Sequence, residues 1–591
     1  MLNRTQIGCL VACVLAVPAL LPAAEKLTTG LNEALTRDKD KVVDVLVRKK
    51  QVGRSRTPFT DFELSRLLSS VSNGVGIGLA TAETNAATGV ARSSLQLVKK
   101  LNNVPVAVIK GKLKDIEALA KDSTVQSVSE DRRLGAAMIA ATTGVGARTV
   151  QNYGWNGAGI GVAVIDSGVS LHKDLRAPGC VGTRVVYREN FVTTENTVED
   201  TYGHGTHVAG IIAGNGACAS SASNQPYKGV APNANIISLR VLDSTGRGTD
   251  SAVIAAIDRA IELRYTYNIR VINLSLGRPV TQSHTTDPLA AAVENAWFNG
   301  ITVVVSAGNM GRSKTSGMDG YGTVNSPGND PLVITVGAMR DMGTTSRTDD
   351  VAASFSAKGP SQIDQVVKPD LVAPGNRIAS TLSPVNPTLQ ASLAANVVPQ
   401  SSTVQANSYI TMSGTSMAAP MVAGAAALLL QKTPSLTPDQ VKARLMKTAY
   451  KAFPASVTYY DQTTMTTYVT YHDLFTIGAG MLDIAAAIDD TAVLGVWADS
   501  PSAMALANGQ VTVAGNVWTE WQNTASLFAF SKVWPGTVLS GTTAVRIGTS
   551  GWGTPGIGAF SLLWGDSLLW GDSLLWGDSL LWGDVAKTGD Q

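Results

Sequence analysis

The stretch GVAVIDSG, residues 161–168, is a continuous apolar run that ends in an acidic and two small residues. Similar runs recur at residues 234–242, 269–277, 300–309, 331–338 and 368–375. Helix-like stretches, such as residues 251–265 and 286–300, lie between these runs. Apolar strands that alternate with helices predict an α/β fold, with a largely parallel, doubly wound sheet and helices on both faces. In such sheets, functional sites form at the carboxyl ends of the strands.

The composition of the chain is that of a globular protein. Its 591 residues are 44% hydrophobic and include 57 glycines, which is typical of packed domains rich in turns. The formal net charge of +2 gives no support to a nucleic-acid partner or to a polybasic membrane patch. We set both classes aside.

The first 24 residues have the order of a secretory signal. Arg4 precedes an apolar run at residues 7–21, and the small residues 22–24 follow. The run is too short for a membrane span, which needs about 20 residues, and no later run qualifies. We therefore expect a secreted chain without a transmembrane segment. An alternative, a lipoprotein cleavage box at residues 10–13, would leave a very short apolar region before it.

Two of the four cysteines remain in the exported chain. Cys9 and Cys13 leave with the signal, and Cys180 and Cys218 stay. An even number of cysteines in an exported chain predicts one disulfide between them, worth about 4 kcal/mol in the loop-entropy model. The alternative is two separate thiols.

A small module precedes the sheet-forming region, which we place at residues 135–490. Residues 25–134 contain strand-like and helix-like runs among many charged residues and predict a small α+β unit. The strand-like runs are residues 42–48, 104–111 and 124–130, and the helix-like run is residues 112–122.

The carboxyl-terminal tail is rich in tryptophan and predicts β or irregular structure. Nine of the 11 tryptophans lie after Asp490, in an extension at residues 491–560 and in four SLLWGD repeats at residues 561–584. Gly-Asp suits a two-residue hairpin turn, so SLLW strands joined by such turns would expose Trp and Leu. We expect the tail to bind a surface or a polymer. The alternative is a removable, low-complexity or secretion-related tail.

Three residue types that suit acyl transfer lie at element boundaries. Asp166 ends the first strand, and His204 lies among glycines where an apolar helix begins. Asn309 ends the strand at residues 300–309, although Asn is also a common turn residue. A metal pair of His204 with His207 is an alternative, but the other histidines lie in no clustered motif.

Ser416 lies in MSGTSMAAPMVAGAAALLL, residues 412–430, where a buried helix begins. Serine caps many helices, and Pro420 is expected in the first turn, so a structural role for Ser416 needs no chemistry. The same helix start presents free N–H groups to an oxyanion. Only other residues can decide between a cap and a nucleophile.

Six motifs in order decide this question: VIDSGV, HGTHVAG, NLSLG, SAGN, KPDLVAPG and GTSMAAP. The chain closely resembles the subtilisin-like serine peptidases over about 350 residues. The resemblance implies that Ser416 attacks the scissile carbonyl, His204 carries the proton and Asp166 orients the imidazole. It also implies that Asn309 and the N–H of Ser416 bind the oxyanion.

The resemblance further implies where substrate binds. An extended peptide would add as a strand between two backbone edges, formed by Ser275, Leu276, Gly277, Gly246, Arg247 and Gly248. Met310 lies next to the pocket for the residue before the cut, where some relatives hold an acid. Without that acid, we expect apolar or broad specificity rather than basic specificity, unless Met310 points away.

The resemblance implies that the module at residues 25–134 is a propeptide that assists folding and inhibits the enzyme.

The chemistry requires no cofactor. A structural calcium ion stays possible, and Asp174 matches a family calcium ligand, but the Cys-containing loop at residues 214–227 departs from the usual calcium loop.

Two alternatives to a secreted endopeptidase remain open. A peptide ligase or macrocyclase would use the same acyl-enzyme and exclude water, with the connection at residues 376–411 as the only candidate lid. A protein that binds surfaces through its Trp-rich tail would use the peptidase domain only as a scaffold.

Overall fold

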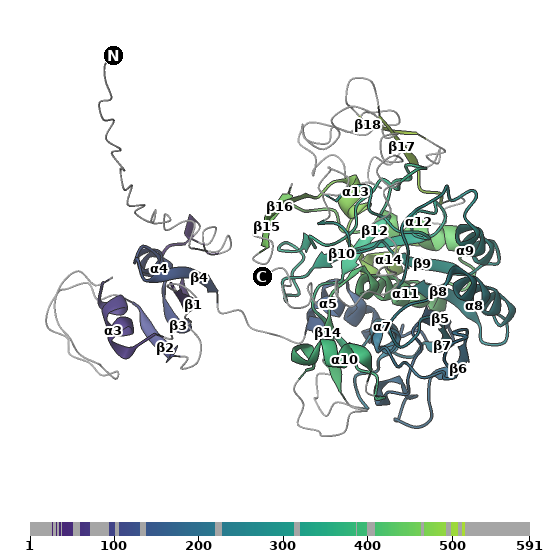
Figure 1. Ribbon diagram of the computed structural model, residues 1–591, viewed down its shortest axis with the longest axis horizontal. Helices are drawn as coiled ribbons and strands as arrows, with labels where there is room; N and C mark the ends of the chain where they lie inside the picture. Colours follow the sequence, from purple (N-terminus) through teal and green to yellow (C-terminus); the bar gives the residue numbers. More distant parts are fainter. Residues whose placement is uncertain are drawn as a thin grey trace, which may run out of the picture. The chain divides into compact units, whose positions relative to one another are not determined.

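A computed structural model of the chain contains two compact units, residues 1–133 and 134–591. Figure 1 shows the elements of each. The structure describes residues 27, 31, 35–36, 38–50, 59–70, 94–100, 106–130, 137–218, 227–312, 320–385, 387–398, 408–454, 456–461, 466–491, 498–505 and 511–514. The predicted signal and the SLLWGD repeats lie outside these residues.

The first unit is an antiparallel sheet with helices, as the α+β prediction for this segment requires. Its strand order is β2-β3-β1-β4. The elements are β1 (Val42–Lys49), α3 (Asp61–Ser70), β2 (Gln96–Lys100), β3 (Val106–Lys112), α4 (Leu113–Ala120) and β4 (Val125–Glu130). Leucine and isoleucine side chains on one face of α4 pack into a separate small core with apolar side chains of β1, β3 and β4. The unit therefore has its own hydrophobic core.

The second unit is built on an eight-stranded sheet with the order β11-β10-β9-β8-β5-β7-β6, in which β12 also pairs with β10. All pairs are parallel except β10 with β11. The strands are β5 (Gly161–Asp166), β6 (Val185–Asn190), β7 (Asn235–Arg240), β8 (Ile269–Leu274), β9 (Thr302–Ser306), β10 (Ile334–Arg340), β11 (Val351–Ala352) and β12 (Leu371–Pro374). The predicted α/β fold with a largely parallel sheet is confirmed.

Helices cover the sheet. Every residue of β5 is buried although successive side chains point to opposite faces, so both faces are covered there. Helix α11 packs on β8, β9 and β10 and against α7, whereas α8 and α9 pack on each other (Figure 1). The helices of this unit are α5 (Ala137–Gly144), α6 (Ala147–Asn152), η1 (Lys173–Leu175), α7 (His204–Ala213), α8 (Asp250–Glu262), α9 (Pro288–Phe298), α10 (Thr388–Ser392), η2 (Ala394–Asn396), α11 (Thr415–Lys432), α12 (Pro438–Thr448), α13 (Leu474–Ile477) and α14 (Ile484–Asp489).

Three two-stranded ribbons complete the unit. They are β13 (Ile378–Thr381) with β14 (Tyr409–Met412), β15 (Ser456–Asp461) with β16 (Thr466–Tyr471), and β17 (Ser502–Ala505) with β18 (Val511–Ala514). Val367 N donates to the carbonyl of Pro501, and Ala503 N donates to Gln365 O. The folded unit therefore continues beyond residue 490, where we placed its end. Among the described residues, no helix has both the length and the apolar character to cross a membrane.

Candidate active site

Asp166 and His204 meet at the carboxyl edge of the sheet. Asp166 is the last residue of β5 and His204 is the first residue of α7, and both are buried. His204 Nδ1 lies 2.7 Å from Asp166 Oδ1. Because a carboxylate only accepts, Nδ1 carries the hydrogen, and the neutral ring keeps its lone pair on Nε2. The pair is therefore prepared for proton transfer at Nε2.

A second buried carboxylate, Asp200, holds the start of α7. Asp200 Oδ1 accepts hydrogen bonds from Gly203 N at 2.6 Å and Ser167 Oγ at 2.8 Å, and Oδ2 accepts one from Thr206 N at 2.7 Å. Burial raises the pKa of Asp200 to about 6, although hydrogen bonds from Thr206 and Gly203 oppose this shift. These bonds fix the turn that carries His204, so Asp200 is a positioning residue that the motif search missed.

The two histidines of α7 have opposite electrostatics. Burial lowers the pKa of His204, but the charge and hydrogen bond of Asp166, with the charge of Asp200, raise it overall above its ordinary 6.5. Burial, followed by the charge of His204, lowers the pKa of His207 to about 3.

The ring of His207 is committed to the fold. Its Nε2 lies 3.1 Å from the carbonyl of Ile378 and 3.0 Å from that of Ile410. It therefore donates a hydrogen between β13 and β14. The alternative of a metal pair with His204 gains no support, because His204 Nδ1 is engaged by Asp166 and no group of three metal-binding side chains among the described residues includes either histidine.

Ser416 is the second residue of α11, so its N–H belongs to the first turn, which has no intrahelical acceptors. Its hydroxyl donates to the carbonyl of Ser275 at 3.0 Å. We expected Pro420 in the first turn, but it is the sixth residue of the helix. Proline has no N–H, so the carbonyl of Ser416 instead accepts a hydrogen bond from Ser275 Oγ at 2.9 Å. Because Pro420 offers no donor, the backbone of Ser416 is hydrogen-bonded to Ser275, the residue that follows β8.

The side chain of Asn309 is oriented by Thr415. Asn309 Oδ1 accepts from Thr415 N at 2.9 Å and from Thr415 Oγ1 at 3.1 Å, and Thr415 Oγ1 accepts from Gly308 N at 3.1 Å. With the oxygen facing α11, the amide NH₂ faces away from that helix and can donate to an oxyanion. The role of Thr415 depends on a contact between distant segments, and no local pattern indicated it.

The residues of the two expected substrate edges follow strands that lie on either side of β5. Ser275, Leu276 and Gly277 directly follow β8 and are buried. In the other edge, Gly246 is buried with φ +79°, and an added Cβ would lie 2.5 Å from the ring of Tyr202. Only glycine fits there without a shift of that ring.

The remaining residues near these edges differ in exposure. Gly248 is partly buried, and Arg247 is exposed. Met310 directly follows Asn309 and is partly buried. Whether the Met310 side chain faces substrate stays a prediction.

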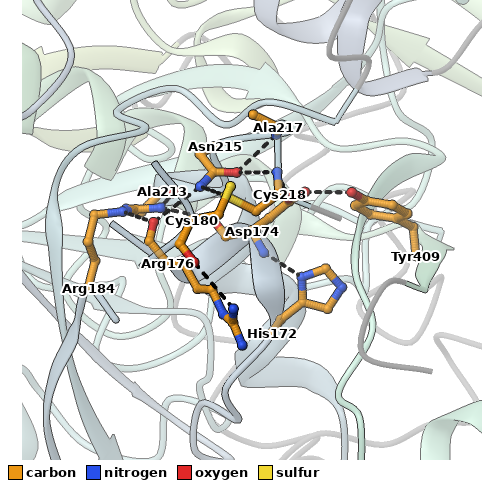
Figure 2. Close-up of a disulfide and its surroundings, with 10 residues drawn as sticks. All are labelled: His172, Asp174, Arg176, Cys180, Arg184, Ala213, Asn215, Ala217, Cys218 and Tyr409. Carbon is orange, nitrogen blue, oxygen red and sulfur yellow. Dashed lines mark hydrogen bonds between the residues drawn. A yellow bond between two sulfur atoms is a disulfide. The ribbon is translucent and has the colours of Figure 1, made fainter. Parts of the chain in front are cut away.

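The predicted disulfide is present, and Figure 2 shows its surroundings. Cys180 and Cys218 are bonded and close a loop with a sequence separation of 38. Cys218 N donates to Asp174 Oδ1 at 3.1 Å, and Tyr409 Oη donates to Asp174 Oδ2 at 2.5 Å. The disulfide loop, η1 and β14 are therefore joined at one buried aspartate.

These contacts do not fit a calcium site at Asp174. Calcium needs six to eight oxygen ligands, but both carboxylate oxygens of Asp174 accept hydrogen bonds from protein donors. The backbone carbonyl of Asp174 also accepts, from Arg184 Nη2 at 2.9 Å and from Asn215 N at 2.9 Å. Burial lowers the pKa of Arg184 to about 10, against the charge of Asp174, so this guanidinium stays charged at neutral pH. The guanidinium of Arg184 supplies the positive charge that a calcium ion would otherwise bring to Asp174.

Comparisons with known proteins agree with this geometry. Residues 157–480, more than half of the chain, match the model of the subtilase family. The chain is 39% identical over 335 residues to serine protease AprX from Bacillus subtilis (strain 168), covering 55% of this chain and 69% of that protein. It is 36% identical over 301 residues to subtilisin DY from Bacillus licheniformis, covering 51% and 87%.

Among solved structures, the crystal structure of a cold adapted subtilisin-like serine proteinase is 32% identical, with a TM-score of 0.36. The match covers 55% of this chain and 90% of the chain in that structure. The family match includes all of the candidate residues from Asp166 to Ser416. The chain belongs to the subtilase family, and it is a serine endopeptidase.

Proposed function

We propose that this enzyme is a secreted endopeptidase that cuts proteins through an acyl-enzyme on Ser416 and is made as a zymogen. The observation that carries the catalytic part is the 2.7 Å contact between His204 Nδ1 and Asp166 Oδ1. It orients the ring and leaves Nε2 as the base. The start of α11, with Ser416 and the oriented Asn309, supplies a nucleophile and two oxyanion donors.

The proposed reaction has two halves, the formation of the acyl-enzyme and its hydrolysis, and the same groups act in both. Ser416 Oγ attacks the scissile carbonyl while His204 Nε2 takes its proton, and Asp166 stabilises the imidazolium. The N–H of Ser416 and the amide of Asn309 hold the oxyanion. His204 then protonates the leaving amine, and water repeats these steps to release the acid.

Substrate would lie as an extended strand between the edges at Ser275–Gly277 and Gly246–Gly248. Backbone hydrogen bonds would provide affinity, and pockets for alternate side chains would provide selectivity. The requirement for glycine at Gly246 supports a tightly packed edge there. We expect cleavage after apolar or varied residues. A peptide library cut mainly after Lys or Arg would contradict this specificity.

The zymogen proposal rests on the separate folded unit before residue 134. This unit has its own core, as a folding module that is later removed requires. Wild-type and Ser416→Ala proteins expressed side by side provide the test, with propeptide loss followed by mass spectrometry. We expect only the wild type to lose the segment before residue 134. Equal processing of both would contradict autocatalytic maturation.

Hydrolysis is favoured over ligation by the connection proposed as a lid. In that connection, Thr388 N and Leu389 N donate to the carbonyls of Thr201 and Tyr202, and β13 pairs with β14. These contacts fasten the described parts of the connection, residues 376–385, 387–398 and 408–411, to the body of the domain. The ratio of hydrolysis to aminolysis with an added amine nucleophile separates the two activities.

A further inference from the structure

Three side chains outside the proposed catalytic site present metal-binding atoms to one another. His284 lies in the loop after β8, Glu294 lies in α9, and Asp330 lies in the turn before β10. His284 Nδ1 is 3.7 Å from Glu294 Oε1 and 3.8 Å from Asp330 Oδ2. All three atoms lie within 4.8 Å of one another.

The buried member of this cluster has an unused oxygen. Asp330 is 0% exposed, and its Oδ1 accepts from Leu332 N at 2.9 Å. Within the described part of the chain, neither Asp330 Oδ2 nor His284 Nδ1 has a hydrogen-bond partner. Buried polar atoms are rarely left in this state. The cluster therefore requires a proton or a cation between its members.

The charge of the cluster agrees with this requirement. The cation that acts on Asp330, Lys368, is already engaged, because its Nζ lies 2.7 Å from Asp370 Oδ2 and 3.0 Å from Val333 O. Two carboxylates and an imidazole therefore face one another, and the lysine that acts on Asp330 is paired with Asp370 instead.

We propose that His284, Glu294 and Asp330 bind a divalent transition metal, with zinc as the best fit. One imidazole nitrogen and two carboxylate oxygens suit zinc, whereas calcium and magnesium prefer oxygen ligands alone. Zinc–ligand distances of about 2.0–2.2 Å place the ligands of a tetrahedral site roughly 3.3–3.6 Å apart. The two separations from His284 Nδ1, 3.7 and 3.8 Å, need only a small contraction, and water would complete the site.

A metal bound by these three side chains would stabilise the substrate edge at Ser275–Gly277. The loop that carries His284 follows Ser275–Gly277, and the other two ligands anchor it to α9 and to the turn before β10. The loop is already tied at one further point, since His284 N donates to Asp364 Oδ2 at 2.8 Å. The metal would therefore act on the stability of this edge rather than on the chemistry.

The test is zinc uptake by the full chain carrying Ser416→Ala, which prevents self-digestion. After chelator treatment and dialysis against Zn²⁺, metal content is compared with that of the same chain carrying Asp330→Asn or His284→Gln. We expect each of these variants to hold one zinc fewer per chain. We also expect zinc to raise the unfolding temperature of the parent by several degrees and to leave that of the variants unchanged.

Matched controls make the result decisive. Glu262→Gln removes an exposed carboxylate on α8, and this variant should bind zinc like the parent. Co²⁺ in place of zinc should give visible absorption bands that His284→Gln abolishes, so the proposal can be tested even if Asp330→Asn does not fold. Equal zinc content in parent and His284→Gln would overturn the proposal. A parent that takes up no zinc would also overturn it and would indicate a proton shared between Asp330 and Glu294.

Discussion

Two buried aspartates, eight residues apart in sequence, lie near opposite ends of α7 and have different partners. Asp166 contacts the ring of His204 at the start of the helix. Asp174 accepts from the phenol of Tyr409 and from the backbone of Cys218, beyond its end. The imidazole can gain or lose a proton near neutral pH, but the phenol and the amide cannot. We therefore expect the same residue type to serve proton transfer at one end and stability at the other.

The comparison teaches that the partner, rather than the burial, decides the role of a buried carboxylate. Both aspartates are 0% exposed. Changes around Asp166 should therefore lower turnover with little effect on stability, and changes around Asp174 should do the reverse. The following experiments test this separation.

The largest effect should come from His204→Ala. Without a base, kcat should fall by about 10⁶-fold, which is the loss known for the corresponding histidine in subtilisin. The unfolding free energy should change far less than the activation free energy, because Asp166 Oδ1 keeps its hydrogen bond from Ser167 N at 2.7 Å. Steady-state kinetics and urea unfolding measure the two quantities. A folded variant with near-normal kcat would contradict the assignment.

Asn309→Ala should lower kcat by about 10²–10³-fold with little change in KM, since the oxyanion forms only after attack. Asn295→Ala, at an exposed position on α9, is the matched control and should be silent. A variant in which KM rises and kcat is kept would mean that Asn309 binds substrate rather than the transition state.

The disulfide variant Cys180→Ser with Cys218→Ser should show the opposite profile. Loss of the cross-link should lower the unfolding free energy by about 2–4 kcal/mol. Turnover of the folded enzyme should stay within about twofold of the wild type. Stability is measured on the Ser416→Ala background to avoid self-digestion. If stability is unchanged, the role of this end of α7 is wrongly assigned.

Tyr409→Phe should give a smaller loss of stability at the same end. It removes the hydrogen bond to Asp174 Oδ2 and should cost about 1–3 kcal/mol. Tyr153→Phe, whose ring is 70% exposed, is the control and should have no effect. Equal unfolding free energies of the Tyr409→Phe and Tyr153→Phe proteins would show that the hydrogen bond from Tyr409 adds no stability beyond that of the disulfide.

The smallest effect concerns pH. The neutral form of His204 is the base, and its pKa is raised above 6.5 in the folded enzyme. Therefore kcat/KM should rise with pH and reach half its maximum above pH 6.5. A half-maximum below pH 6 would mean that the charge of Asp166 does not act on this ring.

The six apolar runs found in the sequence became β5, β7, β8, β9, β10 and β12. Strand β6, with the sequence VVYREN, was missed because only its first residue is buried, so it lacks the continuous apolar pattern of the central strands. The ribbon of β13 and β14 was missed for another reason. Each strand has four residues and, unlike the equally short β12, includes serine or threonine among its apolar residues, so neither forms a continuous apolar run.

The candidate site was predicted only where local motifs carry it. Asp166, His204 and Ser416 each lie in a recognisable motif. The roles of Asp200 and Thr415 arise from contacts with other segments, and the cluster of His284 with Glu294 and Asp330 joins three segments without any shared pattern. Such groupings depend on the tertiary fold, and a single sequence does not show them.

The most direct test of the central claim, that Ser416 is the nucleophile activated by His204, is to label the protein with a fluorophosphonate and to map the modified residue by mass spectrometry. We predict one adduct on Ser416 in the wild type, none on nearby Ser413, and none at all in His204→Ala. An adduct on another serine, or equal labelling of the folded His204→Ala protein, would contradict the account.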